Sequence, residues 1–272
     1  MEKTKIRIGI IGCGAIGTDI AKACENRLKD SIALGAISDI DGKKADLLNE
    51  LLKKKAPVLS IDALIKQSDI VIESASAKVS ADIVGKCIKA RKPCLVMSVG
   101  GLLGKEHLLK LAEDRGVKIY IPSGAICGID GLKSASVGKI DSVTLTTRKP
   151  LKGLEGAPYL KEKNIDITKI KIETVIFEGS AEEAVKGFPQ NVNVSAVLSL
   201  AGVGSTRTRV RIVTSPEYTR NIHEIKITGD CGEMTTRTEN VPSVTNPKTS
   251  ALAIFAAIAT LEGISRSVRI GT

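Results

Sequence analysis

Short apolar runs alternate with amphipathic segments along the first 122 residues. The runs are almost continuous in isoleucine and valine, which is the pattern of strands buried on both faces of a parallel sheet. The segments between them have helical periodicity, so we predict a doubly wound Rossmann domain over residues 1–122. The predicted strands are 6–11, 32–39, 69–73, 94–98 and 117–121, and the predicted helices are 15–28, 42–54, 77–90 and 105–115.

The pattern changes after Gly124, where apolar and polar residues begin to alternate. Such alternation is typical of antiparallel strands with one solvated face. We predict a second, α+β domain over residues 123–245 with a mainly antiparallel sheet, and residues 149–166 as a loop or flap. Its predicted strands are 142–148, 169–177, 207–213, 224–228 and 234–239, and its predicted helices are 124–135 and 192–201.

A last helix is predicted within residues 246–272. Asn246 is a good N-cap and Pro247 suits the first helical position. The segment that follows is rich in alanine and apolar almost all round, so we expect it to be buried and to pack back near the first domain.

The amino-acid composition argues against several classes of function. Aromatic residues make up 2% of the chain and tryptophan is absent, which disfavours a base-stacking platform for nucleic acid. The net charge of +10 comes from lysines and arginines spread along the sequence, as on solvated helix faces. The six cysteines have no metal-ligand spacing, and no apolar run reaches the roughly 18 residues of a membrane span. We therefore expect a reduced, cytoplasmic enzyme without metal, nucleic-acid or membrane partners.

The hexapeptide Gly12-Cys13-Gly14-Ala15-Ile16-Gly17 follows the first predicted strand and opens the first predicted helix. In this context G-x-G-x-x-G is the fingerprint of a dinucleotide-binding loop. Gly12 permits the tight turn, Gly14 lets the backbone approach the pyrophosphate, and Gly17 lets helix and strand pack closely. Glycine clusters also occur in ordinary strand–helix turns, so the loop needs support from elsewhere in the sequence.

Asp39, at the end of the second predicted strand, gives that support. A carboxylate about 20 residues beyond the loop binds the ribose hydroxyls of NAD. Asp39 is also a good turn residue, and the two roles are compatible. An acid here favours NAD, while Lys43 and Lys44 lie close enough in sequence to tolerate NADP.

Three later segments are more discriminating. They are Ser123-Gly124-Ala125-Ile126-Cys127-Gly128-Ile129-Asp130-Gly131, Asn191-Val192-Asn193-Val194-Ser195-Ala196 and Asn246-Pro247-Lys248-Thr249-Ser250. Together with the glycine loop, and in this order, they make the whole chain resemble the L-aspartate dehydrogenase family. The resemblance implies oxidation of L-aspartate to iminoaspartate or oxaloacetate with NAD(P), and a product that feeds de novo NAD biosynthesis. It also implies a homodimer.

The resemblance also implies roles for single residues. Cofactor contacts fall on the backbone N–H of Ala125 and on Asn191, and the active-site histidine matches His223. Cys127 departs from the family, which has a small residue such as alanine there. With an ordinary pKa near about 6.5, His223 would handle the amine proton and activate the water that attacks the imine.

The residues themselves leave simpler alternatives. His223 precedes a predicted strand and could be a hydrogen-bonded strand-end residue, and His107 lies in the first turn of a surface helix. Asn191 and Asn193 could cap a helix.

Lys248 and Thr249 fall in the predicted first helical turn, where a lysine is unfavourable unless an anion binds. With Asn193 they are candidates for binding substrate, and Lys149 is a weaker candidate for a substrate carboxylate.

Two other functions fit the same pattern. One is a related two-domain NAD(P) reductase of another aspartate-pathway metabolite, of the dihydrodipicolinate or homoserine type. The other is a noncatalytic redox sensor that binds NAD(H). Turnover with L-aspartate separates the first prediction from both.

Overall fold

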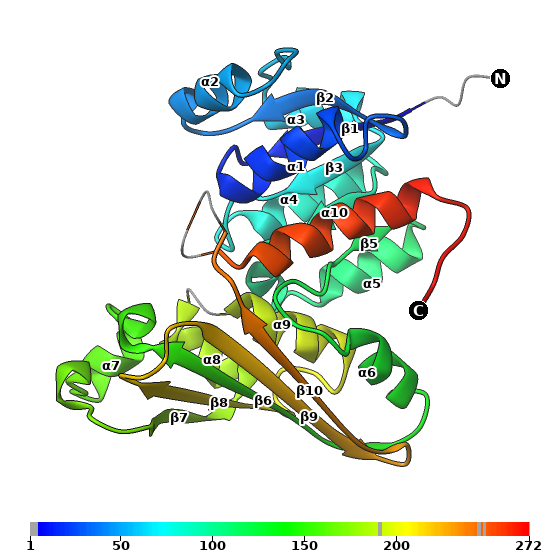
Figure 1. The fold of residues 1–272 in the computed structure, drawn as a ribbon. Coiled ribbons are helices and arrows are strands. Elements are labelled where there is room, and N and C mark those ends of the chain that lie inside the picture. The colour runs from blue at the N-terminus through cyan, green and yellow to red at the C-terminus, as the bar shows by residue number, and fades with distance from the viewer. Residues whose placement is uncertain (1–4, 190–191, 244–245, 247–248, 272) are drawn as a thin grey trace. The chain divides into compact units, whose positions relative to one another are not determined.

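The structure, a computed structural model, describes residues 5–189, 192–243, 246 and 249–271. It divides the chain into two compact units, one of Met1–Pro122 with Ile254–Arg269 and the other of Ser123–Ala253 with Ile270–Thr272. Each unit contains its own sheet (Figure 1). Within the described residues, no helix has the length and apolar character needed to cross a membrane.

The first unit is built from alternating strands and helices. Its sheet has the order β2-β1-β3-β4-β5, and all the neighbouring strands are parallel. The strands are β1 (Ile6–Ile11), β2 (Ile32–Ser38), β3 (Ile70–Glu73), β4 (Cys94–Val96) and β5 (Ile119–Tyr120). The helices are α1 (Ala15–Glu25), α2 (Gly42–Glu50), α3 (Ile61–Gln67), α4 (Ser80–Lys89), the 3₁₀ turn Val99–Leu102 and α5 (His107–Asp114).

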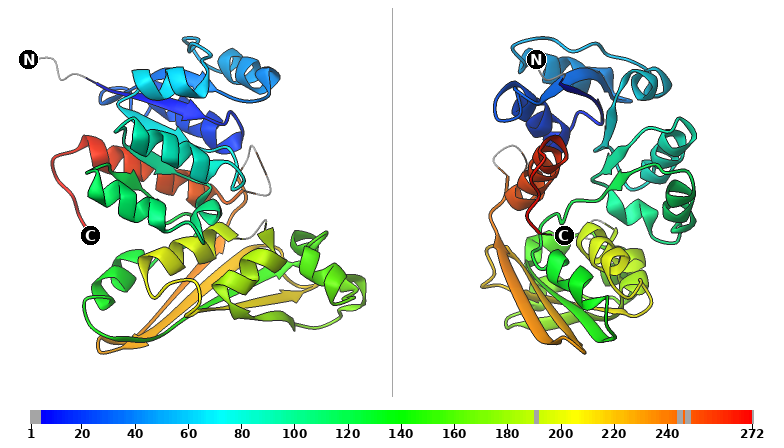
Figure 2. Two further views of the ribbon diagram at one scale, coloured as in Figure 1. Left: turned by 180° about the vertical axis from the view of Figure 1, so that it is seen from behind. Right: turned by 90° about the vertical axis from the view of Figure 1, so that its right-hand side faces the viewer.

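Helices cover both faces of this sheet, as predicted for a doubly wound fold. Helix α1 and the last helix, α10 (Ala251–Ser265), lie on one face, and α3, α4 and α5 lie on the other (Figure 2). Ala257 and Leu261 of α10 are fully buried in the same cluster as Ile8 and Ile10 of β1. The last helix of the chain therefore completes the core of the first unit.

The second unit has a mixed, mostly antiparallel sheet of order β10-β9-β6-β8-β7, in which β6 and β8 are the parallel pair. Its strands are β6 (Ile140–Pro150), β7 (Thr174–Ser180), β8 (Thr208–Ser215), β9 (Asn221–Gly229) and β10 (Gly232–Asn240). Its helices are α6 (Ile129–Ala135), α7 (Pro158–Glu162), α8 (Ala181–Gly187), α9 (Val192–Ala201) and the 3₁₀ turns Leu151–Leu154 and Ile167–Lys169. The predicted fold class is confirmed in both units.

Helices α6, α8 and α9 lie on one face of this second sheet (Figure 1). Alternate residues of β9 such as His223, Ile225 and Ile227 are buried on that face. The opposite face is polar and carries cross-strand ion pairs such as Lys226–Glu233, with 3.0 Å between Nζ and Oε2.

Several short elements differ from the sequence predictions. Helices α3 and α8 were not predicted; Ser60 caps α3, and a capping box of Ser180 and Glu183 begins α8. Helix α6 starts at Ile129 rather than near Gly124, because Gly124 and Gly128 have φ of +67° and +88° and break the helix. The segment expected as a loop from Lys149 instead continues β6 to Pro150 and then contains α7.

The last helix also differs from its prediction. It runs from Ala251 to Ser265, within the expected range 246–272, but it does not begin at Asn246 as predicted. Thr249 precedes the helix and closes a turn, because its N–H donates to the Asn246 carbonyl at 2.9 Å and its own carbonyl accepts from Ser243 N–H at 2.7 Å. Thr249 therefore does not lie in a helical first turn.

The burial of α10 predicts a large loss of stability from one truncation. Leu261→Ala should lower the free energy of unfolding by about 2–5 kcal/mol, because Leu261 is fully buried. The matched change Leu47→Ala, at a site with 59% exposure on α2, should cost about 0.5 kcal/mol or less. Urea unfolding at one fixed protein concentration measures both, and equal losses would contradict the packing of α10 on the first unit.

Candidate functional site

The glycine loop joins β1 to α1 through contacts that leave no room for side chains. Gly12 has φ of +100°, and a Cβ there would lie 2.5 Å from the backbone of Ser74. A Cβ on Gly17 would lie 2.1 Å from the Gly12 carbonyl oxygen. A Cβ on Gly14, in contrast, would meet nothing within 4 Å. The loop is thus closed beneath Gly12 and Gly17 and open above Gly14, where a ligand can approach the backbone.

The beginning of α1 is suited to an anion. Gly14 is its N-cap, and no side chain of a described residue caps it. The backbone N–H groups of Ala15 and Ile16 belong to the first turn, at the positive end of the helix dipole. Such an end binds phosphate groups, so the loop fits the pyrophosphate of a dinucleotide.

Asp39 lies beside this loop and is bonded to it. Its Oδ2 accepts from Cys13 N–H at 2.7 Å, and its Oδ1 accepts from Asp41 N–H at 2.9 Å. Asp39 therefore shapes both the glycine loop and the turn before α2. Burial, reinforced by the Asp39 charge, raises the pKa of the Cys13 thiol to about 12, so Cys13 adds no negative charge where phosphates would bind.

Two residues at the end of β3 that sequence patterns did not indicate hold the backbone there: Ser74 bonds the glycine loop, and Glu73 bonds the segments that follow β3 and β4. Ser74 Oγ donates to the Gly12 carbonyl at 2.9 Å. Glu73 is fully buried, and its carboxylate accepts from the N–H groups of Ala75 and Ser98, each at 2.9 Å. Burial raises the pKa of Glu73. The available signal was an acid that ends an otherwise apolar strand.

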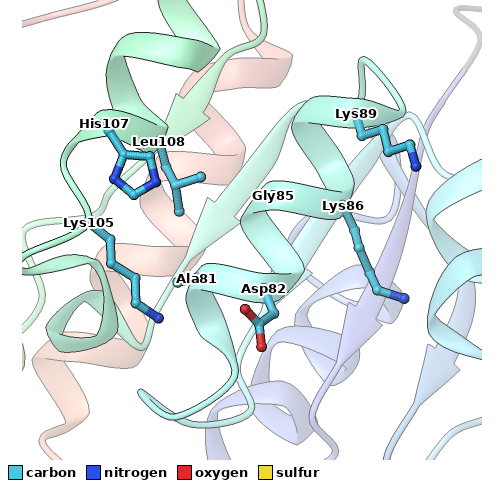
Figure 3. Close-up of a pocket in the computed structure, with 8 residues that line it drawn as sticks. All are labelled: Ala81, Asp82, Gly85, Lys86, Lys89, Lys105, His107 and Leu108. Atoms are coloured by element: carbon cyan, nitrogen blue, oxygen red, sulfur yellow. The ribbon is translucent and has the colours of Figure 1, made fainter.

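A separate surface pocket surrounds His107. It lies between α4 and α5 and is lined by basic side chains such as Lys86, Lys89 and Lys105, with Asp82 nearby (Figure 3). Lys86 also pairs with Asp62, with 2.7 Å between Nζ and Oδ1. His107 is exposed, as the sequence analysis expected, and none of the predicted site residues lines this pocket.

In the second unit, the segment that contains Ala125 is attached to β10 by side chains. Thr238 Oγ1 and Asn240 Nδ2 donate to the Ala125 carbonyl at 3.0 and 3.1 Å, and Thr236 Oγ1 donates to the Cys127 carbonyl at 3.2 Å. These three β10 residues share one face of the strand. They hold the Ala125 segment at the edge of the sheet, which sequence patterns did not reveal.

His223 lies within β9 rather than before it, and is 6% exposed. Its Nδ1 is 3.1 Å from Thr147 Oγ1, its partner in the register of β6 and β9. Thr238, its partner on β10, has its Oγ1 3.4 Å from the His223 carbonyl oxygen. Through Thr238 the structure therefore brings together His223 and the Ala125 segment.

Burial changes the protonation of this site. The pKa of His223 falls from 6.5 to about 3, because of desolvation first and the charge of Lys149 second. Lys149 is 7% exposed, and burial lowers its pKa from 10.5 to about 8. The ordinary histidine pKa used in the sequence analysis does not apply, since His223 is neutral near pH 7.

The other predicted substrate residues are less well defined. Asn193 is exposed near the start of α9, and Thr249 is half-buried in the turn before α10. Asn191 and Lys248 lie outside the described residues. In the first unit the structure gathers Asp39 with the whole glycine loop; in the second it gathers His223, Lys149 and the Ala125 segment.

Both units of the chain resemble known proteins. Residues 130–264 match the family model of the C-terminal domain of aspartate dehydrogenase, and residues 12–122 match that of the NAD-binding domain of homoserine dehydrogenase. The chain is 48% identical to L-aspartate dehydrogenase from Methanosarcina barkeri and 48% identical to that from Methanococcoides burtonii, in each case over 98% of this chain and 100% of the relative. The crystal structure of aspartate dehydrogenase from Thermotoga maritima has the same fold, with a TM-score of 0.75, 24% identity and coverage of 98% of this chain and 100% of that chain.

The open space above Gly14 leads to a binding prediction. Gly14→Ala should weaken dinucleotide binding by about tenfold or more, or at least about 1.4 kcal/mol, because a methyl group occupies the path of the pyrophosphate. The melting temperature should hardly change, since the new Cβ meets no protein atom. Gly85→Ala, which also adds a methyl group in open space, is the matched control. Calorimetric titration with NADH measures the affinities, and equal affinities for the two variants would contradict the assignment.

Proposed function

Because the chain belongs to the L-aspartate dehydrogenase family, we propose that it oxidises L-aspartate with NAD(P). L-Aspartate, oxidised cofactor and water would give oxaloacetate, ammonium, reduced cofactor and one proton, by way of iminoaspartate. The observation that carries this proposal is the match to named L-aspartate dehydrogenases over almost the entire chain. The open phosphate-binding loop and the buried basic groups of the second unit support it.

The cofactor would be held mainly by backbone groups of the first unit. The free first-turn N–H groups of α1 suit the pyrophosphate, and the Asp39 carboxylate suits the ribose hydroxyls. When bound, the nicotinamide accepts the hydride that leaves Cα of the amino acid. The proposed cofactor-binding residues are Gly12, Gly14, Ala15, Ile16, Gly17, Asp39, Ala125 and Asn191.

We propose that NAD is preferred and NADP tolerated. The carboxylate of Asp39 would repel a 2′-phosphate, whereas Lys43 and Lys44 at the start of α2 would attract one.

Replacing the acid should shift this preference. Asp39→Ser should lower the ratio of kcat/KM for NAD to that for NADP by tenfold or more, on the scale of about 1.5–3 kcal/mol for a hydrogen bond to a charged group. Asp41 caps α2 by accepting from Lys43 N–H at 3.1 Å, so Asp41→Ser is a control nearby that should leave the ratio unchanged. Steady-state kinetics with both cofactors measure it, and an unchanged ratio in Asp39→Ser would remove Asp39 from the ribose site.

The substrate is a dicarboxylate, and its negative charges need cationic or N–H partners. We propose Asn193, Lys248 and Thr249 as substrate-binding residues. A bound dicarboxylate would also raise the pKa of basic groups nearby, because a negative charge favours their protonated forms.

His223 is the proposed catalytic residue. It is neutral near pH 7, and in the tautomer whose Nδ1–H donates to Thr147, Nε2 can accept a hydrogen bond from water. In this role His223 activates the water that adds to the imine carbon. The charge of the bound substrate would stabilise the imidazolium that forms.

The substrate and the role of His223 can be tested together. Purified protein mixed with L-aspartate and NAD should produce reduced cofactor, followed by its absorbance. His223→Ala should lower kcat by about 10²-fold or more, the usual contribution of a general base. His107→Ala should keep wild-type kcat, because His107 is exposed on α5. Turnover of another substrate but not L-aspartate would reject the substrate, and full activity of His223→Ala would reject its role.

A related reductase is the second candidate. The first unit matches a family model that is named for homoserine dehydrogenase, so homoserine is the substrate to compare. Oxidation of homoserine faster than L-aspartate at equal concentration would favour this alternative.

We further propose that the protein is a cytoplasmic homodimer that supplies iminoaspartate to NAD biosynthesis, as the family resemblance implies. Light scattering of the purified protein measures its mass, and a monomer would contradict the dimer. Expression in a bacterium that needs added nicotinate for want of iminoaspartate should restore growth without it. Failure of an active enzyme to do so would contradict the biosynthetic role.

A further inference from the structure

Strand register places Lys149 and His223 on the same face of the second sheet. Thr147 of β6 is paired with His223 of β9, and residues two apart on a strand share a face. Thr147, Lys149 and His223 therefore point to the side covered by α8 and α9. Thr147 also lines a small cavity between these helices and the sheet.

The charged residues next to Lys149 and His223 in their strands lie on the opposite face of the sheet. Arg148 and Glu224 follow Thr147 and His223 in their strands, so they point away from Lys149 and pair with each other, with 3.4 Å between Nη1 and Oε2. Thr214 of β8, whose Oγ1 donates to the Lys149 carbonyl at 2.7 Å, has no charge. On the covered face, the charge of Lys149 reaches His223 and helps to lower the pKa of its imidazole.

Lys149 and His223 are adjacent bases in one buried site, and their pKa values differ widely. Burial leaves Lys149 with a pKa of about 8 and His223 with a pKa of about 3. Pairs of groups separated in this way take different roles in acid–base catalysis. Near neutral pH the lysine exchanges protons readily, whereas the histidine is a neutral hydrogen-bonding group.

We propose that Lys149 is the catalytic base that takes a proton from the α-ammonium group of the substrate. This rests on the proposed amino-acid oxidation. One N–H bond of the substrate ammonium breaks and one N–H bond forms on Lys149 Nζ, which becomes an ammonium. The substrate nitrogen keeps the electron pair, which enters the C=N bond when the hydride leaves Cα. Lys149 later releases the proton that appears in the overall reaction.

The proposal divides the chemistry between two residues. Lys149 prepares the amine for oxidation, and His223 activates water for hydrolysis of the imine. A single histidine with a pKa of about 3 would be a weak acceptor for an amine proton, whose usual pKa is several units higher. The lysine matches that donor far better.

The chain that follows β6 folds back over Lys149. A Cβ on Gly153, in the 3₁₀ turn Leu151–Leu154, would lie 3.8 Å from Lys149 Cβ, so this turn packs on the lysine stem. The same segment, which includes Gly156, borders a cavity of about 160 Å³. The turn that packs on Lys149 is therefore continuous with the lining of a cavity.

Lys149→Arg separates a base from a fixed positive charge. Arginine keeps the charge but does not lose its proton near neutral pH. We expect wild-type kcat/KM to rise with pH through about 8 and then level, because the base must be unprotonated. Lys149→Arg should lose about 10²-fold or more in kcat and also lose this rising limb, with a much smaller change in KM. Lys152→Arg, in the exposed turn, is the matched control and should behave as wild type.

Chemical rescue covers the case of an arginine variant that folds poorly. Methylamine added to Lys149→Ala should restore activity in proportion to its concentration, while His223→Ala should not respond. Retention of wild-type kcat and pH dependence by a folded Lys149→Arg would overturn the proposal, as would a folded Lys149→Ala that no amine rescues.

The substrate of the wild-type enzyme is identified first, so that failure of the substrate proposal can be told apart from failure of the proposal for Lys149. If another amino acid is oxidised in place of L-aspartate, the same variants are measured with it and the role of Lys149 stands or falls separately. Oxidation of hydroxy acids alone would overturn the role of Lys149, because such substrates have no ammonium proton.

Discussion

The first unit depends on a contact between two backbone segments with no side chain between them. The Gly12 carbonyl oxygen would lie 2.1 Å from a Cβ on Gly17, so α1 can approach β1 this closely only because position 17 is glycine. This close approach aims the free N–H groups of α1 along the strand direction, and Ser74 and Asp39 bond the loop from its two sides. The anion-binding property thus comes from backbone geometry, and side chains serve mainly to hold that geometry.

In the second unit, the chemistry that we propose depends on side chains on the covered face of the sheet. Burying Lys149 and His223 disfavours their charged forms and makes no obvious contribution to stability. On the solvated face, charged residues such as Lys226 and Glu233 pair across strands, as an ordinary surface would have them. The placement of these two bases among buried residues is the observation behind the acid–base roles that we propose for them.

Sequence periodicity predicted the larger elements because they are long or strongly apolar, as in β1, α1 and α9. It missed α3 and α8, which are short and depend on the caps Ser60 and Ser180. The glycine loop and Asp39 could be found because their functions require residue types at fixed spacing. Lys149 was only a weak candidate in the sequence. Its place beside His223, 74 positions later, depends on the register of β6 and β9. The bonds from Thr238 and Asn240 to Ala125 also join distant parts of the chain, and no local pattern indicates them.

Helix α10 follows the whole second sheet in the sequence, yet it completes a core that begins with β1. Ile8 and Leu261 share one buried cluster although they lie at opposite ends of the sequence. During translation the first unit would have its strands and its loop long before it has the helix that covers one of its faces. Domains generally fold as units while the chain emerges, with the N-terminal domain first. Here the first unit departs from that order, because its core stays incomplete until the second sheet has been synthesised and α10 has followed it.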